Sequence, residues 1–345
     1  MRTLGLDVGG ANLKAADGSG QAWTMPFALW REPAALDQRL ADLVARAGPC
    51  DGLALTMTAE LCDCFASKRH GVEHVLNTAS ATAGDRPLHI WTLDGRFVTE
   101  AEARARPLRC AASNWLALAT WAARNWALGT QTLLLDVGST TTDVIWLADG
   151  QPRPSGWTDT ERLTSGELVY LGVKRTPLMA LGPHVLFNGR PVRLMAEHFA
   201  TSEDVFVLAG KLPAEPGATD TADGRPMTCN AAAARIARMI GADLEQLTMT
   251  GARDLAGGFA HTMARRIVRA IGQVTGGRRP DRVVVSGAGE FLASEAATGV
   301  WPDVDQVSLT RQVGRQISAA ACAHALVQVH HAWYGRCPAP PTGRP

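Results

Sequence analysis

LGLDVGGANLK (residues 4–14) recurs 129 residues later as LLLDVGSTTTD (residues 133–143). Each copy ends an apolar run with an aspartate, Asp7 or Asp136, and then continues through a glycine turn into a second apolar run. A tight glycine turn between two apolar runs is typical of a β-hairpin. Internal repetition on this scale indicates related structural units. The sequence therefore predicts two α/β domains, each opening with a strand, a turn and a returning strand.

The segments outside the two hairpins carry alternating helix and strand patterns. In the first half we expect a strand at 21–25, a helix carrying Leu36, Leu40 and Leu43, a strand at 53–56, a helix at 68–79, an extended segment at 89–98 and a helix at 112–128. In the second half we expect helices at 203–209, 230–240, 255–275, 290–297 and 311–330, and a strand at 282–286. The predicted domains are 1–128 and 129–336, followed by a disordered, proline-rich tail at 337–345.

Composition restricts the class of protein. Apolar residues make up 46% of the 345 residues and charged residues 19%, which is normal for a globular enzyme and excludes a disordered chain. The net charge of +1 gives no broad attraction to nucleic acid or to an anionic membrane, so we expect neither as a partner. The seven cysteines are scattered and odd in number, and no targeting segment is recognisable, so we expect reduced thiols and a cytoplasmic location.

The hairpin turns carry the residue types that a phosphate site needs. Glycines allow a phosphate to approach main-chain N–H groups, and hydroxyls and a lysine add donors. A carboxylate at a strand end, as at Asp7 and Asp136, suits a hydrated Mg²⁺, which prefers oxygen ligands. A third glycine turn follows the strand at 282–286. The candidate phosphate-binding residues are Gly9, Gly10, Asn12, Lys14, Gly138, Ser139, Thr140, Thr141, Arg175, Gly287 and Gly289.

Together, the three glycine turns resemble the two phosphate motifs and the adenosine motif of the actin, hexokinase and 70-kDa heat-shock superfamily. The resemblance spans nearly the whole chain and implies two actin-like (ribonuclease H-like) α/β domains with mixed sheets around a central cleft. Closer likeness is to hydantoinase/oxoprolinase-like proteins linked to tetrahydromethanopterin one-carbon metabolism. The motifs that carry this likeness are the two hairpins, TMTAEL (56–61), GELVYLGVKRTP (166–177) and AEHFATSEDV (196–205).

Archaeal members of this branch resemble the synthase that joins the furan and tyramine parts of methanofuran. The resemblance implies an aminomethylfuran-methyl diphosphate and a γ-glutamyl-tyramine as substrates, with diphosphate released, Mg²⁺ as cofactor and no consumption of ATP. The chain could assemble as a homodimer. A phenol has a pKa of about 10 and needs a base before its oxygen attacks well. Asp143, Glu60 and Glu167 are the carboxylates available in the matched motifs.

Several alternatives stay open at this point. Glu60 could instead cap a helix, Glu167 could be a first-turn helix acid, and Arg175 could belong to a loop held by an ion pair. An ATP-dependent small-molecule kinase of the same fold explains the hairpins equally well. A non-catalytic nucleotide-binding protein is disfavoured by the intact Asp7, Lys14, Asp136 and Asp143. Amide-ring hydrolysis is weaker still, because hydantoinases and oxoprolinases of this fold are far longer chains.

Overall fold

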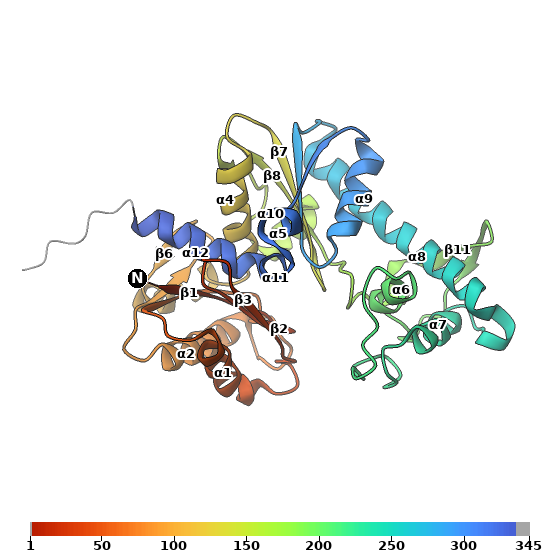
Figure 1. The fold of residues 1–345 in the computed structure, drawn as a ribbon, viewed down its shortest axis with the longest axis horizontal. Helices are drawn as coiled ribbons and strands as arrows, with labels where there is room; N and C mark the ends of the chain where they lie inside the picture. The colour runs from red at the N-terminus through yellow and green to blue at the C-terminus, as the bar shows by residue number, and fades with distance from the viewer. Residues whose placement is uncertain (1, 336–345) are drawn as a thin grey trace, which may run out of the picture. The chain divides into compact units, whose positions relative to one another are not determined.

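Two mixed β-sheets form the framework of the computed structural model, which describes residues 2–335 (Figure 1). The described chain divides into two units. Unit 1 comprises residues 2–132, 145–159 and 309–335, and unit 2 comprises residues 133–144 and 160–308. Both units are therefore discontinuous, whereas the predicted ranges ran continuously along the chain. The predicted boundaries stay a prediction, and the tail predicted at 337–345 lies outside the described residues.

The sheet of unit 1 has the strand order β3-β2-β1-β4-β5-β6. Strand β1 pairs antiparallel with β2 and parallel with β4, and both β1 and β4 are buried along their whole length. Strands covered on both faces are mainly apolar, as these two sequences are, and their polar residues lie near the strand ends. The strands are β1 (Thr3–Val8), β2 (Asn12–Ala16), β3 (Ala22–Pro26), β4 (Gly52–Met57), β5 (Leu88–Trp91) and β6 (Phe97–Val98).

Helices of unit 1 begin at recognisable signals. The side chain of Ser67 caps α2 by accepting a hydrogen bond from the His70 amide, and Thr99 and Glu102 form a capping box at α3. Leu36, Leu40 and Leu43 of α1 are buried on one helix face, as predicted. The helices up to residue 132 are α1 (Leu36–Ala47), α2 (Lys68–Ala83), α3 (Glu100–Ala105) and α4 (Asn114–Trp126).

Three short helices replace the single helix that we predicted at 311–330, so this prediction is wrong. They are α10 (Leu309–Val313), α11 (Arg315–Ala319) and α12 (Ala321–Tyr334). Gly314 separates the first two with φ +85°, a left-handed conformation that favours glycine, and Ala320 separates the last two with φ −119°. Helix α12 returns to pack on β1 and α4 (Figure 1).

The second sheet has the strand order β10-β8-β7-β13-β14, with β9 paired to β8. Its strands are β7 (Thr132–Val137), β8 (Thr142–Ala148), β9 (Gln151–Pro152), β10 (Leu168–Val169), β13 (Arg282–Ser286) and β14 (Asp305–Ser308). A separate two-stranded hairpin, β11 (His184–Phe187) and β12 (Arg190–Arg193), was not predicted. The helices between residues 159 and 300 are α5 (Asp159–Ser165), α6 (Ser202–Leu208), α7 (Cys229–Arg238), α8 (Leu244–Thr275) and α9 (Glu290–Val300).

The predicted α/β class with mixed sheets is confirmed, and so are both repeated hairpins, β1–β2 and β7–β8. That the two hairpin turns face each other across one cleft stays a prediction. Among residues 2–335, none of the helices has the length and apolar character needed to cross a membrane.

Candidate functional site

Main-chain hydrogen bonds to its carbonyl groups hold the first hairpin turn in place. The Gly9 amide donates to the Asn12 carbonyl at 3.1 Å and closes the turn, and the Leu29 amide donates to the Gly10 carbonyl at 3.0 Å. Within residues 2–335, the amides of Gly10 and Ala11 donate no hydrogen bond. Successive unengaged amides in a turn are a suitable site for an anion. This turn can therefore bind phosphate oxygens through its main chain.

The second hairpin turn repeats this arrangement. The Gly138 amide donates to the Thr141 carbonyl at 2.8 Å, and the Ser139 carbonyl accepts from the Arg175 amide at 3.0 Å. In the part of the chain that the structure describes, the amides of Ser139 and Thr140 donate no hydrogen bond. The predicted phosphate-binding turns thus share one pattern, in which carbonyls are fixed by a later segment and two amides stay available.

The segment 172–176 supports the second turn from below. A Cβ on Gly172 would lie 2.4 Å from the Thr140 nitrogen, so only glycine can pack here. The Thr176 hydroxyl accepts from the Gly172 amide at 2.9 Å and fixes the segment in place. Arg175 contributes its backbone to this support, and its side chain is exposed. The motif at residues 166–177 therefore has a structural role in addition to any contact with a ligand.

The third glycine turn lies against the end of β7. The Gly289 amide donates to the Val137 carbonyl at 2.8 Å. Gly287 has φ +90°, and a Cβ there would lie 2.3 Å from the Val137 carbonyl oxygen and 2.7 Å from Oδ1 of Asp136. Close backbone approach explains both glycines, and their predicted contact with a phosphate or nucleotide stays a prediction. The buried hydroxyl of Ser286, just before this turn, has no hydrogen-bond partner among the described residues.

Asp7 is a buried carboxylate at the end of β1. It is 4% exposed, and its Oδ1 atom has no hydrogen-bond partner within residues 2–335. Burial raises the pKa of Asp7, and the charge of Lys14 and a hydrogen bond from the Asn114 side chain oppose only part of that effect. Lys14 lies directly opposite Asp7 in the register of β1 and β2. Asn114, which begins α4, was missed from the sequence because only the fold brings it to Asp7.

A hydrated Mg²⁺ fits this carboxylate. Among the described residues, no group of three or more His, Cys, Asp or Glu side chains is arranged to hold a metal ion. Mg²⁺ does not need such a group, because it keeps several waters and binds through one or two carboxylates. An unpartnered oxygen such as Oδ1 of Asp7 is the kind of ligand that it takes. Asp136 ends β7 in the same way and is half-buried.

Asp143 forms an ion pair with a buried arginine that the sequence did not reveal. Its Oδ1 accepts from Arg162 at 2.6 Å, and Arg162, on α5, is 2% exposed. Arg162 also donates to the Glu167 carbonyl at 3.2 Å. A charge-assisted hydrogen bond of this kind stabilises the carboxylate form, so this oxygen of Asp143 is a poor proton acceptor. The polar stretch 151–164 showed no pattern that would pair it with Asp143.

The two glutamates differ in their contacts. Glu167 is buried and accepts a hydrogen bond from the Ser165 hydroxyl at 2.8 Å. It directly precedes strand β10, so its interpretation as a first-turn helix acid is wrong. Glu60 does not cap α2, because Ser67 does. Neither glutamate therefore has the role at a helix terminus that was its alternative interpretation.

Glu60 is a second buried carboxylate with a raised pKa. It is 1% exposed, and its Oε2 atom has no hydrogen-bond partner in the described chain. Burial raises the pKa of Glu60 to about 7, although the charge of Lys68 and the amide of Ala112 favour the ionised form. Ala112 has φ +47°, a strained conformation for alanine that places this amide beside the carboxylate. Gly71 of α2 packs on the Glu60 backbone, where a Cβ would lie 2.3 Å from the carbonyl oxygen.

Comparisons with known proteins add a family and several relatives. A family model described as hydantoinase/oxoprolinase matches residues 51–331. A (4-{4-[2-(gamma-L-glutamylamino)ethyl]phenoxymethyl}furan-2-yl)methanamine synthase from Methanocaldococcus jannaschii is 29% identical over 329 residues, which cover 94% of this chain and 96% of the relative. A synthase with the same description from Methanococcus vannielii is 28% identical over 190 residues, or 54% of this chain and 85% of the relative.

Among solved structures, a nucleotide-free acetone carboxylase aligns with a TM-score of 0.51 at 10% identity. The alignment covers 94% of this chain and 69% of that chain. At this identity the likeness concerns the fold alone.

Proposed function

The chain belongs to the hydantoinase/oxoprolinase family, and from its likeness to the two archaeal synthases we propose that it is a cytoplasmic synthase of methanofuran-type cofactor biosynthesis. It joins an (aminomethyl)furan-methyl diphosphate to the phenol of a γ-glutamyl-tyramine and releases diphosphate. The names of the archaeal relatives describe a product that contains the corresponding phenoxymethyl-furan ether and γ-glutamylamino group. The Methanocaldococcus jannaschii relative matches 94% of this chain, so the likeness is not confined to one unit.

The repeated turn is the observation that supports this proposal most. In both copies an aspartate ends the strand, and a later segment of the chain donates hydrogen bonds to the carbonyl groups of the turn. Two amides remain available to an anion. The reaction forms a C–O bond between the phenol oxygen and the furan CH₂ and breaks the C–O bond to diphosphate. No phosphoryl group moves, so ATP is not consumed. The main requirement is donors directed at the charge that develops on the leaving diphosphate.

In the first hairpin, the amides of Gly10 and Ala11 and the side chain of Lys14 hold that leaving group. The second hairpin repeats the pair of amides at Ser139 and Thr140. When bound to Asp7 or Asp136, Mg²⁺ would supply charge neutralisation at the diphosphate oxygens. The carboxylates position that charge, and their substitution should affect turnover more than folding.

We assign the general base to Glu60. A base works best when its pKa lies near the working pH, and the pKa of Glu60 is about 7. Its unpartnered Oε2 has room for one proton, whereas Asp143 is occupied by Arg162 and Glu167 by Ser165. Glu60 takes the phenolic proton as the oxygen attacks. Asp143 and Glu167, the other two carboxylates predicted from the motifs, then orient the second turn and its neighbours.

A single incubation tests the function. Purified protein is mixed with Mg²⁺, the furan diphosphate and a tyramine derivative, without ATP, and the products are followed by mass spectrometry. We expect ether and diphosphate in equal amounts. The Methanocaldococcus jannaschii synthase serves as a parallel control for the substrates. Turnover that requires ATP, or no ether while the control is active, would show that the proposal is wrong.

A further inference from the structure

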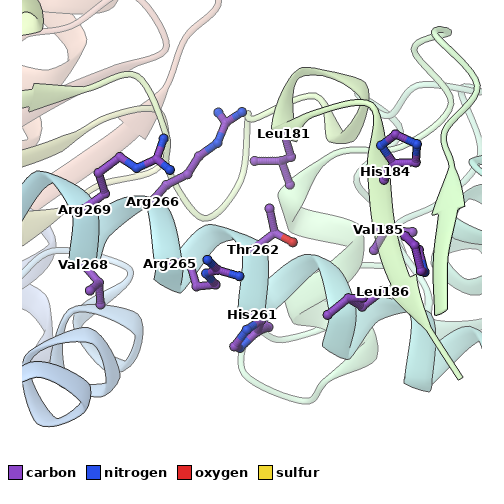
Figure 2. Close-up of a pocket in the computed structure, with 11 residues that line it drawn as sticks. Leu181, His184, Val185, Leu186, His261, Thr262, Arg265, Arg266, Val268 and Arg269 are labelled. Atoms are coloured by element: carbon purple, nitrogen blue, oxygen red, sulfur yellow. The ribbon is translucent and has the colours of Figure 1, made fainter. Parts of the chain in front are cut away.

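A groove lined with arginines runs along helix α8 in unit 2 (Figure 2). Its volume is about 540 Å³. Helix α8 forms one wall, and the hairpin β11–β12 with the short 3-10 helix η3 (Leu178–Leu181) forms the other. The function proposed above leaves this groove unused. It is lined by Leu181, His184, Val185, Leu186, Pro191, His261, Thr262, Arg265, Arg266, Val268 and Arg269.

The walls of the groove are fixed to each other. A Cβ on Gly258 of α8 would lie 2.2 Å from the Leu186 carbonyl oxygen, so the hairpin packs directly on the helix backbone. Arg266 donates to the Ala180 carbonyl of η3 at 2.8 Å. The groove is therefore a built feature of unit 2, with both walls held by contacts that depend on particular residues.

The groove carries positive charge without a balancing carboxylate. Arg265 and Arg269 are four residues apart on α8, Arg266 directly follows Arg265, and none of the three forms an ion pair within residues 2–335. No Asp or Glu lines the groove. Burial, and then the charge of Arg269, lower the pKa of Arg266, as expected for a cation that faces another cation. In Figure 2 the side chains of Arg266 and Arg269 leave α8 toward the side on which Leu181 lies.

We propose that this groove binds an extended oligocarboxylate, namely the acidic glutamyl part of the acceptor. The inference rests on the proposed function, because the name of the Methanocaldococcus jannaschii relative describes a product with a γ-glutamylamino group. The three arginines span roughly 6 Å along the helix at 1.5 Å per residue, so a ligand with more than one carboxylate can contact more than one of them. Guanidinium groups pair with carboxylates through two parallel hydrogen bonds. Leu181, Val185 and Val268 offer apolar contacts to the methylene groups between them.

The groove lies within reach of the second turn. The Arg175 amide supports Ser139, and Ala180, the partner of Arg266, follows Arg175 by five residues. Five extended residues span at most about 18 Å. A phenol near the turn and an acidic chain in the groove can therefore belong to one acceptor molecule. A polynucleotide is the less suitable anion, because the net charge of +1 gives it no wider positive surface.

Calorimetric titration with tri-γ-glutamate tests the inference without turnover. We expect the double variant Arg265→Ala/Arg269→Ala to bind about a hundredfold more weakly than wild type, since each charge-assisted contact contributes about tenfold. Arg253→Ala is the matched control. It removes an exposed arginine of the same helix, outside the groove, and should bind like wild type. Binding to the peptide should also weaken as salt concentration rises.

Steady-state kinetics separate this inference from the proposed function. The double variant should raise KM for an acceptor with three glutamyl residues and leave kcat unchanged, because the contact is made equally in the ground and transition states. Ether synthesis with equal peptide binding by wild type and the double variant would overturn the groove assignment alone. Tighter binding of duplex RNA than of tri-γ-glutamate would also overturn it. Peptide binding that depends on the arginines, without ether synthesis, would support the groove and refute the synthase.

Discussion

The two hairpins share a backbone and differ in how their charges are balanced. In the first, Asp7 ends β1 and Lys14 lies opposite it on β2, so one hairpin contains both signs. In the second, Asp136 and Asp143 occupy the corresponding places in the repeat, and both are acidic. The positive charge there comes from Arg162 on α5. The turn geometry is thus set locally by glycine, whereas the electrostatics of the second turn depend on a residue outside the repeat.

Because of this difference, we expect the two hairpins to have different roles. A cation within the first hairpin leaves one oxygen of Asp7 without a partner, and that oxygen can serve a metal ion. In the second hairpin, Arg162 of α5 pairs with Asp143 and gives this carboxylate a structural role. Four experiments can sharpen or contradict this contrast.

The largest effect is expected from the strand-end aspartates. Asp7→Asn and Asp136→Asn should each lower kcat about a thousandfold, because each removes a carboxylate that would hold Mg²⁺ for the leaving diphosphate. The free energy of unfolding should stay the same or rise for Asp7→Asn, since burial penalises its charged form. Turnover and urea denaturation measure the two effects. Asp303→Asn, at an exposed position, is the control. Near-normal turnover of either variant at low Mg²⁺ would contradict the metal role.

Removal of Arg162 should lower the free energy of unfolding more than removal of Lys14, the cation within the first hairpin. Arg162→Met leaves Asp143 without its buried partner and should lower the free energy of unfolding by about 3 kcal/mol. Lys14→Met removes a half-buried cation and should cost about 1 kcal/mol or less. Chemical denaturation of both variants measures the difference. Adding Asp143→Leu to Arg162→Met should recover part of the loss; equal losses in the two hairpins would remove the contrast.

Glu60 should make the stability of unit 1 depend on pH. Its pKa is about 7 in the folded chain and 4.5 as the ordinary value, so the folded state binds more protons between these values. Stability therefore falls as pH rises from 4.5 to 7, by up to about 3 kcal/mol. Glu60→Gln should abolish this decline and also remove the acidic limb of the kcat profile. The comparison is made as a difference between the two proteins, which cancels other titrating groups such as His330. An unchanged pH slope in the variant would contradict the assignment.

The smallest effect concerns diphosphate itself. Lys14→Ala should weaken diphosphate binding about tenfold to a hundredfold, since a charge-assisted hydrogen bond contributes about 1.5–3 kcal/mol. Asp143→Asn, which weakens only the ion pair with Arg162, should instead leave diphosphate binding within about twofold of wild type. Calorimetric titrations of both variants and wild type with diphosphate and with ATP measure these effects. Mg²⁺-dependent binding of ATP, with none for diphosphate, would favour a kinase.

The features that the sequence predicted correctly are those that depend on residues close together in the chain. Glycine turns between apolar runs located both hairpins, and buried apolar runs located β4 and β13. Contacts between distant segments were not accessible in the same way. Arg162 lies in a polar stretch without periodicity, and Asn114 reaches Asp7 only through the packing of α4. The predicted helix at 311–330 failed because apolar periodicity continued through Gly314, whose left-handed conformation ends a helix. The catalytic and ligand-binding roles stay predictions.

Helix α12 has a consequence for the order in which the chain folds. A Cβ on Gly5 of β1 would lie 2.4 Å from the Ala323 carbonyl oxygen, so the first strand and the last described helix meet without an intervening side chain. On the ribosome, β1 is synthesised about 300 residues before that helix, and contacts of such sequence separation form late. Residues 160–308 of unit 2 are complete before then. The apolar face of unit 1 therefore stays uncovered during synthesis, when it is exposed to chaperones and to aggregation.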